Sequence, residues 1–320
     1  MTVKVSLLIV LLFLVIGASL FLGPVPINPF HLDQTQEVIV WSVRAPRTVV
    51  SVLMGMALGA AGAVLQGILR NPLADPYVLG ISSGASLCAA VGILGGLTFL
   101  GAFTVPLLAF GGALATGALV GVLGWKRGGL WPERLLLAGV GLSFLLSALL
   151  MLIMTISTDE GMRKAMLWIF GDLSMSDWSR VPYGTAFVAA GLALALFRSK
   201  ALNALVLGDD LAHSLGFTPQ RERLTLFTAV GLMTAASVSL GGMIGFIGLL
   251  IPHILRLFTG ADNRILVPAS AVGGGVLLCV ADLVSCMALP PMELPAGVIT
   301  ALIGSPYFLY LLRRKNVLGP

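Results

Sequence analysis

Ten long apolar stretches run along the 320 residues of the chain, separated by short polar connections. A helix that crosses about 30 Å of hydrocarbon needs roughly 20 mainly apolar residues. Such a helix satisfies its own backbone amides, which an open loop or strand in lipid does not. The pattern therefore predicts an all-α integral membrane protein with about ten transmembrane helices. The expected spans are residues 5–22, 48–69, 79–100, 104–125, 135–156, 182–197, 224–241, 243–258, 265–288 and 294–312.

The composition supports this class. Hydrophobic residues make up 58% of the chain and charged residues only 10%, which is too little polar surface for a protein in water. No connection between spans is long enough to form a separate soluble domain of ordinary size. We therefore expect one transmembrane domain that covers residues 1–320.

The basic residues predict the orientation, because cytoplasmic loops retain Lys and Arg. With the N-terminus inside, fourteen basic residues fall on the cytoplasmic side and five on the outer side. Both termini are then cytoplasmic. The net charge of +5 is a topology signal on this interpretation, and nucleic acid is not an expected partner. The cytoplasmic set is Lys4, Arg70, Lys126, Arg127, Arg134, Arg198, Lys200, Arg221, Arg223, Arg256, Arg264, Arg313, Arg314 and Lys315.

Two polar segments interrupt the pattern of spans and short turns. Residues 157–181 are long and of mixed charge, and lie outside in this topology. Residues 198–223 lie inside and are too polar to span. Their spaced leucines predict one or two short amphipathic helices, broken at Gly208 and Gly216. A folded element of this size on the cytoplasmic side indicates a partner protein.

The chain carries no signature of an enzyme. None of its five lysines follows a glycine, so a phosphate-binding P-loop is absent. There is no HExxH pattern and no Cys or His spacing typical of a metal site. We expect no catalytic residue, no metal and no cofactor bound by this chain. Any ATP hydrolysis must occur in another subunit.

Four sequence blocks together resemble a known family. They are WSVRAPRTVVSVLMGMALGAAGAVLQGILR at 41–70, NPLADPYVLGISSGA at 71–85, GFIGLLIPHILRLFTGADNRILVP at 245–268 and ELPAGVITALIGSPYFLYLL at 293–312. In this order they resemble the permeases of type II ATP-binding-cassette importers, which move cobalamin, haem and iron–siderophore chelates. The resemblance runs essentially from end to end.

The resemblance implies an assembly in a bacterial or archaeal cytoplasmic (inner) membrane. Two copies of a ten-helix permease surround one pathway, with two ATPase subunits below and a periplasmic substrate-binding protein above. ATP and Mg are used by the partner ATPase. The implied function is transport of a metal chelate, with ferric siderophore or haem as first choice and cobalamin next. The alternative is an ion-coupled secondary transporter acting as a single chain, which would need ionisable groups near the membrane midplane.

The resemblance also assigns roles to particular residues. The segment from Gly208 to Gly216 matches the element that couples the permease to its ATPase; the alternative is an ordinary solvated loop. Arg44 and Arg47 match arginines that receive glutamates of the binding protein; the alternative is that they anchor a helix end in headgroups. A third arginine of some relatives would fall at Cys286. The coupling residues are Gly208, Asp209, Asp210, Leu211, Leu215 and Gly216.

Asn71 and Leu73 match positions that form a cytoplasmic gate in relatives, and the alternative is a simple turn cap, since Asn before Pro is common in turns.

Asp282 is the one carboxylate well inside an expected span. A charge at the bilayer centre costs about 2.5–3.5 kcal/mol on insertion scales, so another group must compensate it. We expect a structural role against a neighbouring helix rather than a proton relay.

Overall fold

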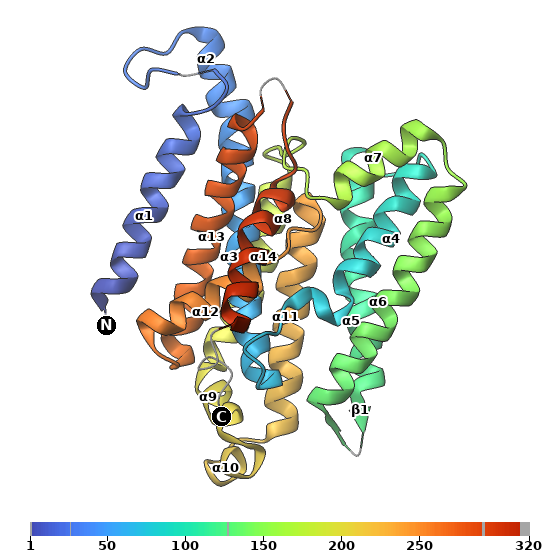
Figure 1. Cartoon of the computed structure of the whole chain (residues 1–320), viewed down its shortest axis with the longest axis vertical. Coiled ribbons are helices and arrows are strands. Elements are labelled where there is room, and N and C mark those ends of the chain that lie inside the picture. Colours follow the sequence, from blue (N-terminus) through green and yellow to red (C-terminus); the bar gives the residue numbers. More distant parts are fainter. Residues whose placement is uncertain (1, 26, 127, 290–291, 314–320) are drawn as a thin grey trace.

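The computed structural model shows a bundle of helices (Figure 1) and describes residues 2–25, 27–126, 128–289 and 292–313. Arg127, Arg314 and Lys315, counted above in the topology, lie outside the described residues. The helices are α1 (Thr2–Phe21), α2 (Gln34–Val38), α3 (Ala45–Leu69), α4 (Ile81–Leu94), α5 (Thr104–Gly124), α6 (Pro132–Thr155), α7 (Asp159–Ile169), α8 (Arg180–Phe197), α9 (Ser199–Leu207), α10 (Asp209–Ser214), α11 (Pro219–Gly241), α12 (Ile247–Thr259), α13 (Asn263–Met287) and α14 (Ala296–Arg313). Strands β1 (Trp125–Lys126) and β2 (Gly129–Leu130) form a small antiparallel hairpin.

Every one of the ten expected spans overlaps a helix of the structure, which confirms the all-α class. Among the described residues, six helical segments are long and apolar enough to cross a membrane by themselves. Four further apolar helices are shorter, so the number of ten spans stays a prediction. The six long segments are Gln34–Leu69, Gly101–Gly124, Pro132–Thr155, Arg180–Phe197, Pro219–Gly241 and Asn263–Met287.

The second span begins earlier than the expected residue 48. The chain is helical from Gln34 onward and passes through a π-helical turn at Ile39–Arg44 directly into α3. Asp33 starts this segment, because its side chain accepts a hydrogen bond from the backbone N–H of Gln36, whose own side chain returns the contact. Pro46 directly follows the π-helical turn and has no N–H to donate, so the wider turn lies where one helical hydrogen bond is missing.

The eighth span, expected at 243–258, begins later in the structure. Gly242 and Phe246 have φ values of 80° and 69°, and helical geometry does not pass through either residue. The remaining helix α12 has 13 residues, about 20 Å at 1.5 Å per residue, which is less than the hydrocarbon thickness. The irregular residues 242–246 pack inside the protein, where Ile244 is fully buried. Such backbone is tolerated at membrane depth only when protein covers it.

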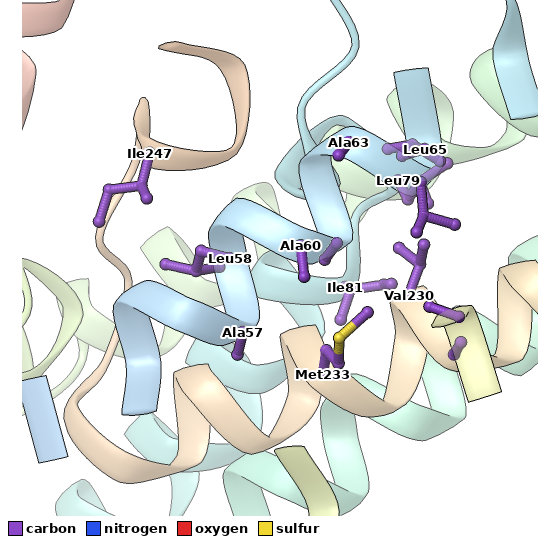
Figure 2. Packing of buried hydrophobic residues seen from close by; sticks show 14 of the residues in the cluster. Ala57, Leu58, Ala60, Ala63, Leu65, Leu79, Ile81, Val230, Met233 and Ile247 are labelled. Carbon is purple, nitrogen blue, oxygen red and sulfur yellow. The ribbon is translucent and has the colours of Figure 1, made fainter. Parts of the chain in front are cut away.

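Helix α3 lies at the centre of the bundle, and α13 packs directly against it (Figure 1). Glycines allow the close approach, because a Cβ atom at Gly55 or Gly59 would overlap the backbone of Gly274 or Ser270. Small residues spaced four apart on one helix face are the main packing device in lipid. Figure 2 shows apolar side chains of α3 meeting those of neighbouring segments. The labelled residues are Ala57, Leu58, Ala60, Ala63, Leu65, Leu79, Ile81, Val230, Met233 and Ile247.

Both polar segments contain helices. Residues 157–181 include α7, whose N-terminus is capped by the side chain of Thr158. Residues 198–223 form α9 and α10, as the leucine spacing predicted, with breaks where Gly208 and Gly216 have φ values of 133° and 85°. In Figure 1, α9 and α10 lie at one end of the bundle with the β hairpin, and α2 and α7 lie at the other end.

Candidate functional site

The expected coupling element presents an apolar surface at the end of the bundle. Leu207, Leu211 and Leu215 are 67%, 44% and 58% exposed, while Ala212 between them is buried. Asp210 is also exposed. After α10, the N–H of Phe217 donates to the carbonyl of Ala212 and that of Gly216 to His213, which closes the helix end. The result is the short fixed helix α10, which carries the exposed Leu211 and Asp210 and is flanked by the exposed Leu207 and Leu215.

The two adjacent aspartates differ in their surroundings. Asp209 accepts a hydrogen bond at 2.8 Å from the buried Arg223 guanidinium and another from Arg70. Arg70 also donates from Nε to the carbonyl of Leu205 at 2.7 Å. Asp209 therefore fixes α10 to the rest of the protein, and Asp210 faces outward. The pattern of two acidic residues did not distinguish these roles.

Arg70 connects the expected coupling element to the candidate gate. It ends α3 in a left-handed conformation with φ 48°, and the NPLADP segment begins at the next residue. Its guanidinium contacts both α9 and α10, through Leu205 and Asp209. Sequence reasoning counted Arg70 only as a topology charge. The signal that could have identified Arg70 is its position between the end of a helix and a proline-rich loop.

The candidate gate residues lie in a tight, anchored loop. The side chain of Asn71 accepts a hydrogen bond from the backbone N–H of Leu73 at 3.0 Å, which is the geometry of a turn cap. Both side chains are partly buried. Further along, the hydroxyl of Tyr77 accepts from the backbone N–H of Ile244 at 3.0 Å. The loop is thereby attached to the irregular segment that precedes α12.

Asp75 caps the short helical turn Pro76–Leu79 in the same loop. Its carboxylate accepts from the backbone N–H of Tyr77 at 2.9 Å. Burial raises the pKa of Asp75 to about 6, although bonds from the backbone N–H groups of Tyr77 and Leu249 oppose that effect. This carboxyl group therefore titrates close to neutral pH.

Arg44 and Arg47 lie together at the other end of the bundle. They line one pocket of about 200 Å³ with Asp282, Cys286 and Glu293. The guanidinium of Arg44 donates to the carbonyls of Leu20 and Val25 at 3.1 and 2.6 Å. Cys286 therefore lies beside the two arginines. In the sequence, only the family resemblance indicated that this position belongs to the same pocket.

Arg47 forms an ion pair with Asp282. Its Nε atom donates to both carboxylate oxygens at 3.1 and 3.0 Å, and Nη2 donates at 2.9 Å. Its Nη1 atom donates to Glu293 at 2.7 Å. The side chains of Arg47 and Asp282 are 13% and 3% exposed, whereas that of Glu293 is 45% exposed. The compensating group that Asp282 requires is therefore an arginine 235 positions away in sequence.

A groove of about 640 Å³ lies beside the candidate gate loop. Tyr77 of the loop and Ser82 and Ser83 of α4 form one side, and α14 forms the other with Ala301 and Ser305. The rest of the lining is mainly apolar and includes Ile169, Phe170, Met243 and Leu302. The groove offers room for a bulky molecule with few specific contacts.

Long apolar helices, a short exposed helix at one end and an arginine pocket at the other define a multi-pass membrane transport subunit. The chain belongs to the FecCD transport family, which it matches over residues 8–314. This family places it among the permeases of type II ATP-binding-cassette importers, as the four sequence blocks indicated.

Several relatives have named functions. The hemin transport system permease protein HmuU of Yersinia pestis is 38% identical over 87% of this chain and 84% of its own length. The cobalamin import system permease protein BtuC of Halobacterium salinarum is 41% identical over 90% of this chain and 77% of its own. The iron(3+)-hydroxamate import system permease protein FhuG of Bacillus subtilis is 34% identical over 97% and 95%.

Solved structures share the fold. A metal-chelate type ABC transporter in an inward-facing conformation superposes with a TM-score of 0.88 at 31% identity, covering 98% of this chain and all of that one. PsaBC of Streptococcus pneumoniae, at 14% identity and a TM-score of 0.53 over 82% of this chain and 88% of its own, is similar in fold alone. The permease fold expected from the sequence is therefore confirmed.

Proposed function

We propose that this chain is the transmembrane permease subunit of an ATP-driven importer that moves a metal chelate from a periplasmic binding protein into the cytoplasm. The family match over residues 8–314 carries the proposal. Relatives named for hemin, cobalamin and iron(3+)-hydroxamate define the class of cargo. Ferric siderophore or haem is the first choice, and cobalamin the next. The membrane is the cytoplasmic (inner) membrane of a bacterium or archaeon.

The proposed assembly contains two copies of this chain. Helix α6 buries only Leu135 and Gly139, and its apolar side chains Leu137, Phe144 and Met151 are 74%, 75% and 72% exposed. Such a surface suits lipid or a second copy. The groove beside Tyr77 would then form one half of a pathway completed by the partner, wide enough for a chelate.

A separate ATPase would bind α10. The exposed Leu207, Leu211 and Leu215 supply apolar contact area, and Asp210 supplies a charge. A movement of α10 would reach the gate through Asp209 and Arg70, because Arg70 directly precedes Asn71. This is a contiguous set of contacts of the kind that carries energetic coupling.

The binding protein would dock at the arginine pocket. Arg44 is partly exposed, and Arg47 keeps Glu293 at the rim of the pocket. A carboxylate of the binding protein would take the place of Glu293 on Arg47, because Arg offers several donors to carboxylates. Asp282 would stay in place, since it is nearly fully buried.

The secondary transporter gains no support from the described residues. Asp282 is paired with Arg47, which fits a structural role and not a proton relay. No cluster of three or more His, Cys, Asp or Glu side chains suited to a metal ion occurs in the described part of the chain.

Reconstitution tests the proposal. The chain is inserted in proteoliposomes with its ATPase and binding protein, and uptake of ferric siderophore, haem and cobalamin is measured with and without ATP. We expect ATP-dependent uptake of one of these chelates. Uptake driven by an ion gradient without ATP would support the single-chain alternative. Arg44→Glu is expected to reduce uptake by weakening docking, and a partner Glu→Arg change is expected to restore part of it.

A further inference from the structure

A second groove, with no role in the proposed function, lies between α5 and α11. It has a volume of about 710 Å³ and an almost entirely apolar lining. Gly117 and Gly121 of α5 and Gly231 of α11 line it, together with Leu224 and Phe227 of α11. A role for this groove requires only that the chain spans a membrane, and it does not depend on the cargo or on the ATPase.

The missing side chains of the glycines create the depth of this groove. A Cβ atom at Gly231 would meet no atom within 4 Å, and one at Gly121 would only touch the Phe227 ring at 3.4 Å. These two positions are therefore not required for close helix packing, unlike Gly55 and Gly59. They leave a slot between the two helices that a flexible apolar chain would fill.

One end of the groove has the features of a lipid headgroup region. Trp125 lines it and is 44% exposed, and tryptophan is enriched at membrane interfaces. This is also the end of the bundle that carries α9 and α10 in Figure 1. A molecule lying in the groove would therefore extend from the membrane interior to its surface.

Three exposed cations gather at this end. Lys126 follows Trp125, and Arg134 donates from Nη1 to the carbonyl of Trp125 at 3.2 Å. Arg221 lies on α11 one turn before Leu224, on the same side of the helix. Glu133 is an exposed carboxylate nearby, which leaves a local excess of positive charge. Basic pockets between membrane helices on the cytoplasmic side suit anionic lipid headgroups.

We propose that this groove binds an anionic phospholipid. One acyl chain lies along the glycines between α5 and α11, and the phosphate group contacts Lys126, Arg134 and Arg221. The glycines provide the space for the chain, and the cations select the headgroup. Lipid bound in this way would hold α5 against α11 at the end of the bundle that carries the coupling element.

Native mass spectrometry of the full-length protein tests this, with phosphatidylglycerol and phosphatidylcholine as the probes. Wild type is expected to retain phosphatidylglycerol about tenfold better than phosphatidylcholine, because the cations attract a headgroup with a net negative charge and not one whose charges cancel. Gly231→Leu fills the slot and is expected to lose both lipids. A triple variant, Lys126→Gln, Arg134→Gln and Arg221→Gln, is expected to retain both equally.

Gly111→Leu is the matched control, because a Cβ there also meets no atom within 4 Å and the residue does not line the groove. It is expected to bind lipid as wild type does. If Gly231→Leu fails to fold, Thr228→Phe fills the same space from an exposed position. Equal retention of phosphatidylglycerol by wild type and the filled variants overturns the proposal. The proposal is also overturned if wild type shows no headgroup preference. It is overturned as well if the filled variants keep their lipid but lose the dimer.

Discussion

Arg47 and Asp282 form a bidentate ion pair that joins the outer ends of α3 and α13. Both side chains are largely withdrawn from solvent. The arginine that the sequence suggested for contact with a partner is thus also a structural element of the chain itself. The proposed docking and the stability of the fold would therefore depend on the same side chain.

Loss of Asp282 should destabilise the protein strongly. Asp282→Leu leaves the Arg47 charge buried with only Glu293, and breaking a buried pair typically costs about 3–5 kcal/mol. The double variant Arg47→Leu with Asp282→Leu is expected to be more stable than Asp282→Leu alone, because no unpaired charge remains. Unfolding midpoints of the variants in one detergent measure this. Equal midpoints for Asp282→Leu and wild type would contradict the buried pair.

The two aspartates of the proposed coupling element should respond differently to substitution. Asp210→Lys is expected to abolish stimulation of the ATPase with no change in the unfolding midpoint, since Asp210 is exposed. Asp209→Asn is expected to lower both, because Arg223 is buried and loses a charged partner. Asp159→Lys in the first turn of α7, at the opposite end, is the control and should change neither. Full ATPase stimulation in Asp210→Lys would exclude this surface as the coupling site.

Gly59 should be intolerant of any side chain. A Cβ atom would overlap the carbonyl oxygen of Ser270, and this backbone cannot move without separating α3 from α13. Gly59→Ala is therefore expected to reduce the yield of folded protein sharply. Gly111→Ala, where a Cβ meets nothing within 4 Å, should behave as wild type. Size-exclusion profiles of the two variants after identical purification provide the comparison.

Asp75 should make stability depend on pH. Its pKa in the fold is about 6 against an ordinary value of 3.8, so the fold favours the protonated form. The contribution is fully present below pH 3.8 and is lost as pH rises through about 6. Asp75→Asn keeps an acceptor for the Tyr77 N–H but cannot ionise. The stability of the variant relative to wild type is expected to rise from pH 4 to pH 7, and a constant difference in unfolding midpoint would refute it.

Cysteines at positions 71 and 73 should report closure of the candidate gate. In a background without Cys88, Cys279 and Cys286, Asn71→Cys or Leu73→Cys is expected to cross-link two copies in the resting state and to block uptake until reduced. The geometric reason is that the prolines at 72 and 76 fix a loop rather than a continuing helix. An active transporter that cross-links in no nucleotide state would leave Asn71 with only its observed role as a turn cap.

The helices were predictable because their apolar runs are long and most of their breaks carry glycine or proline. The ends of α9 and α10 were predictable for the same reason, because they fall at Gly208 and Gly216, which both adopt positive φ. The start of α12 was not predictable, because Phe246 adopts positive φ without any local signal. Tertiary packing holds it there.

The candidate site was predictable in part. A lone carboxylate in an apolar run indicated that Asp282 needs a partner, but the partner lies on another helix 235 positions away. Likewise, the resemblance assigned Asp209 and Asp210 together to the expected coupling element. Only the fold shows that Arg70 and Arg223 form ion pairs with Asp209.

The central place of α3 determines when the protein can finish folding. Its neighbours α11, α12 and α13 all follow residue 218, so the ribosome completes α3 long before they exist. During synthesis, the glycine-rich surface of α3 and the charge of Arg47 therefore remain without their partners, either in the insertion machinery or in lipid. Chains that end before α13 would retain that unmatched surface, which is a feature that membrane quality control can recognise.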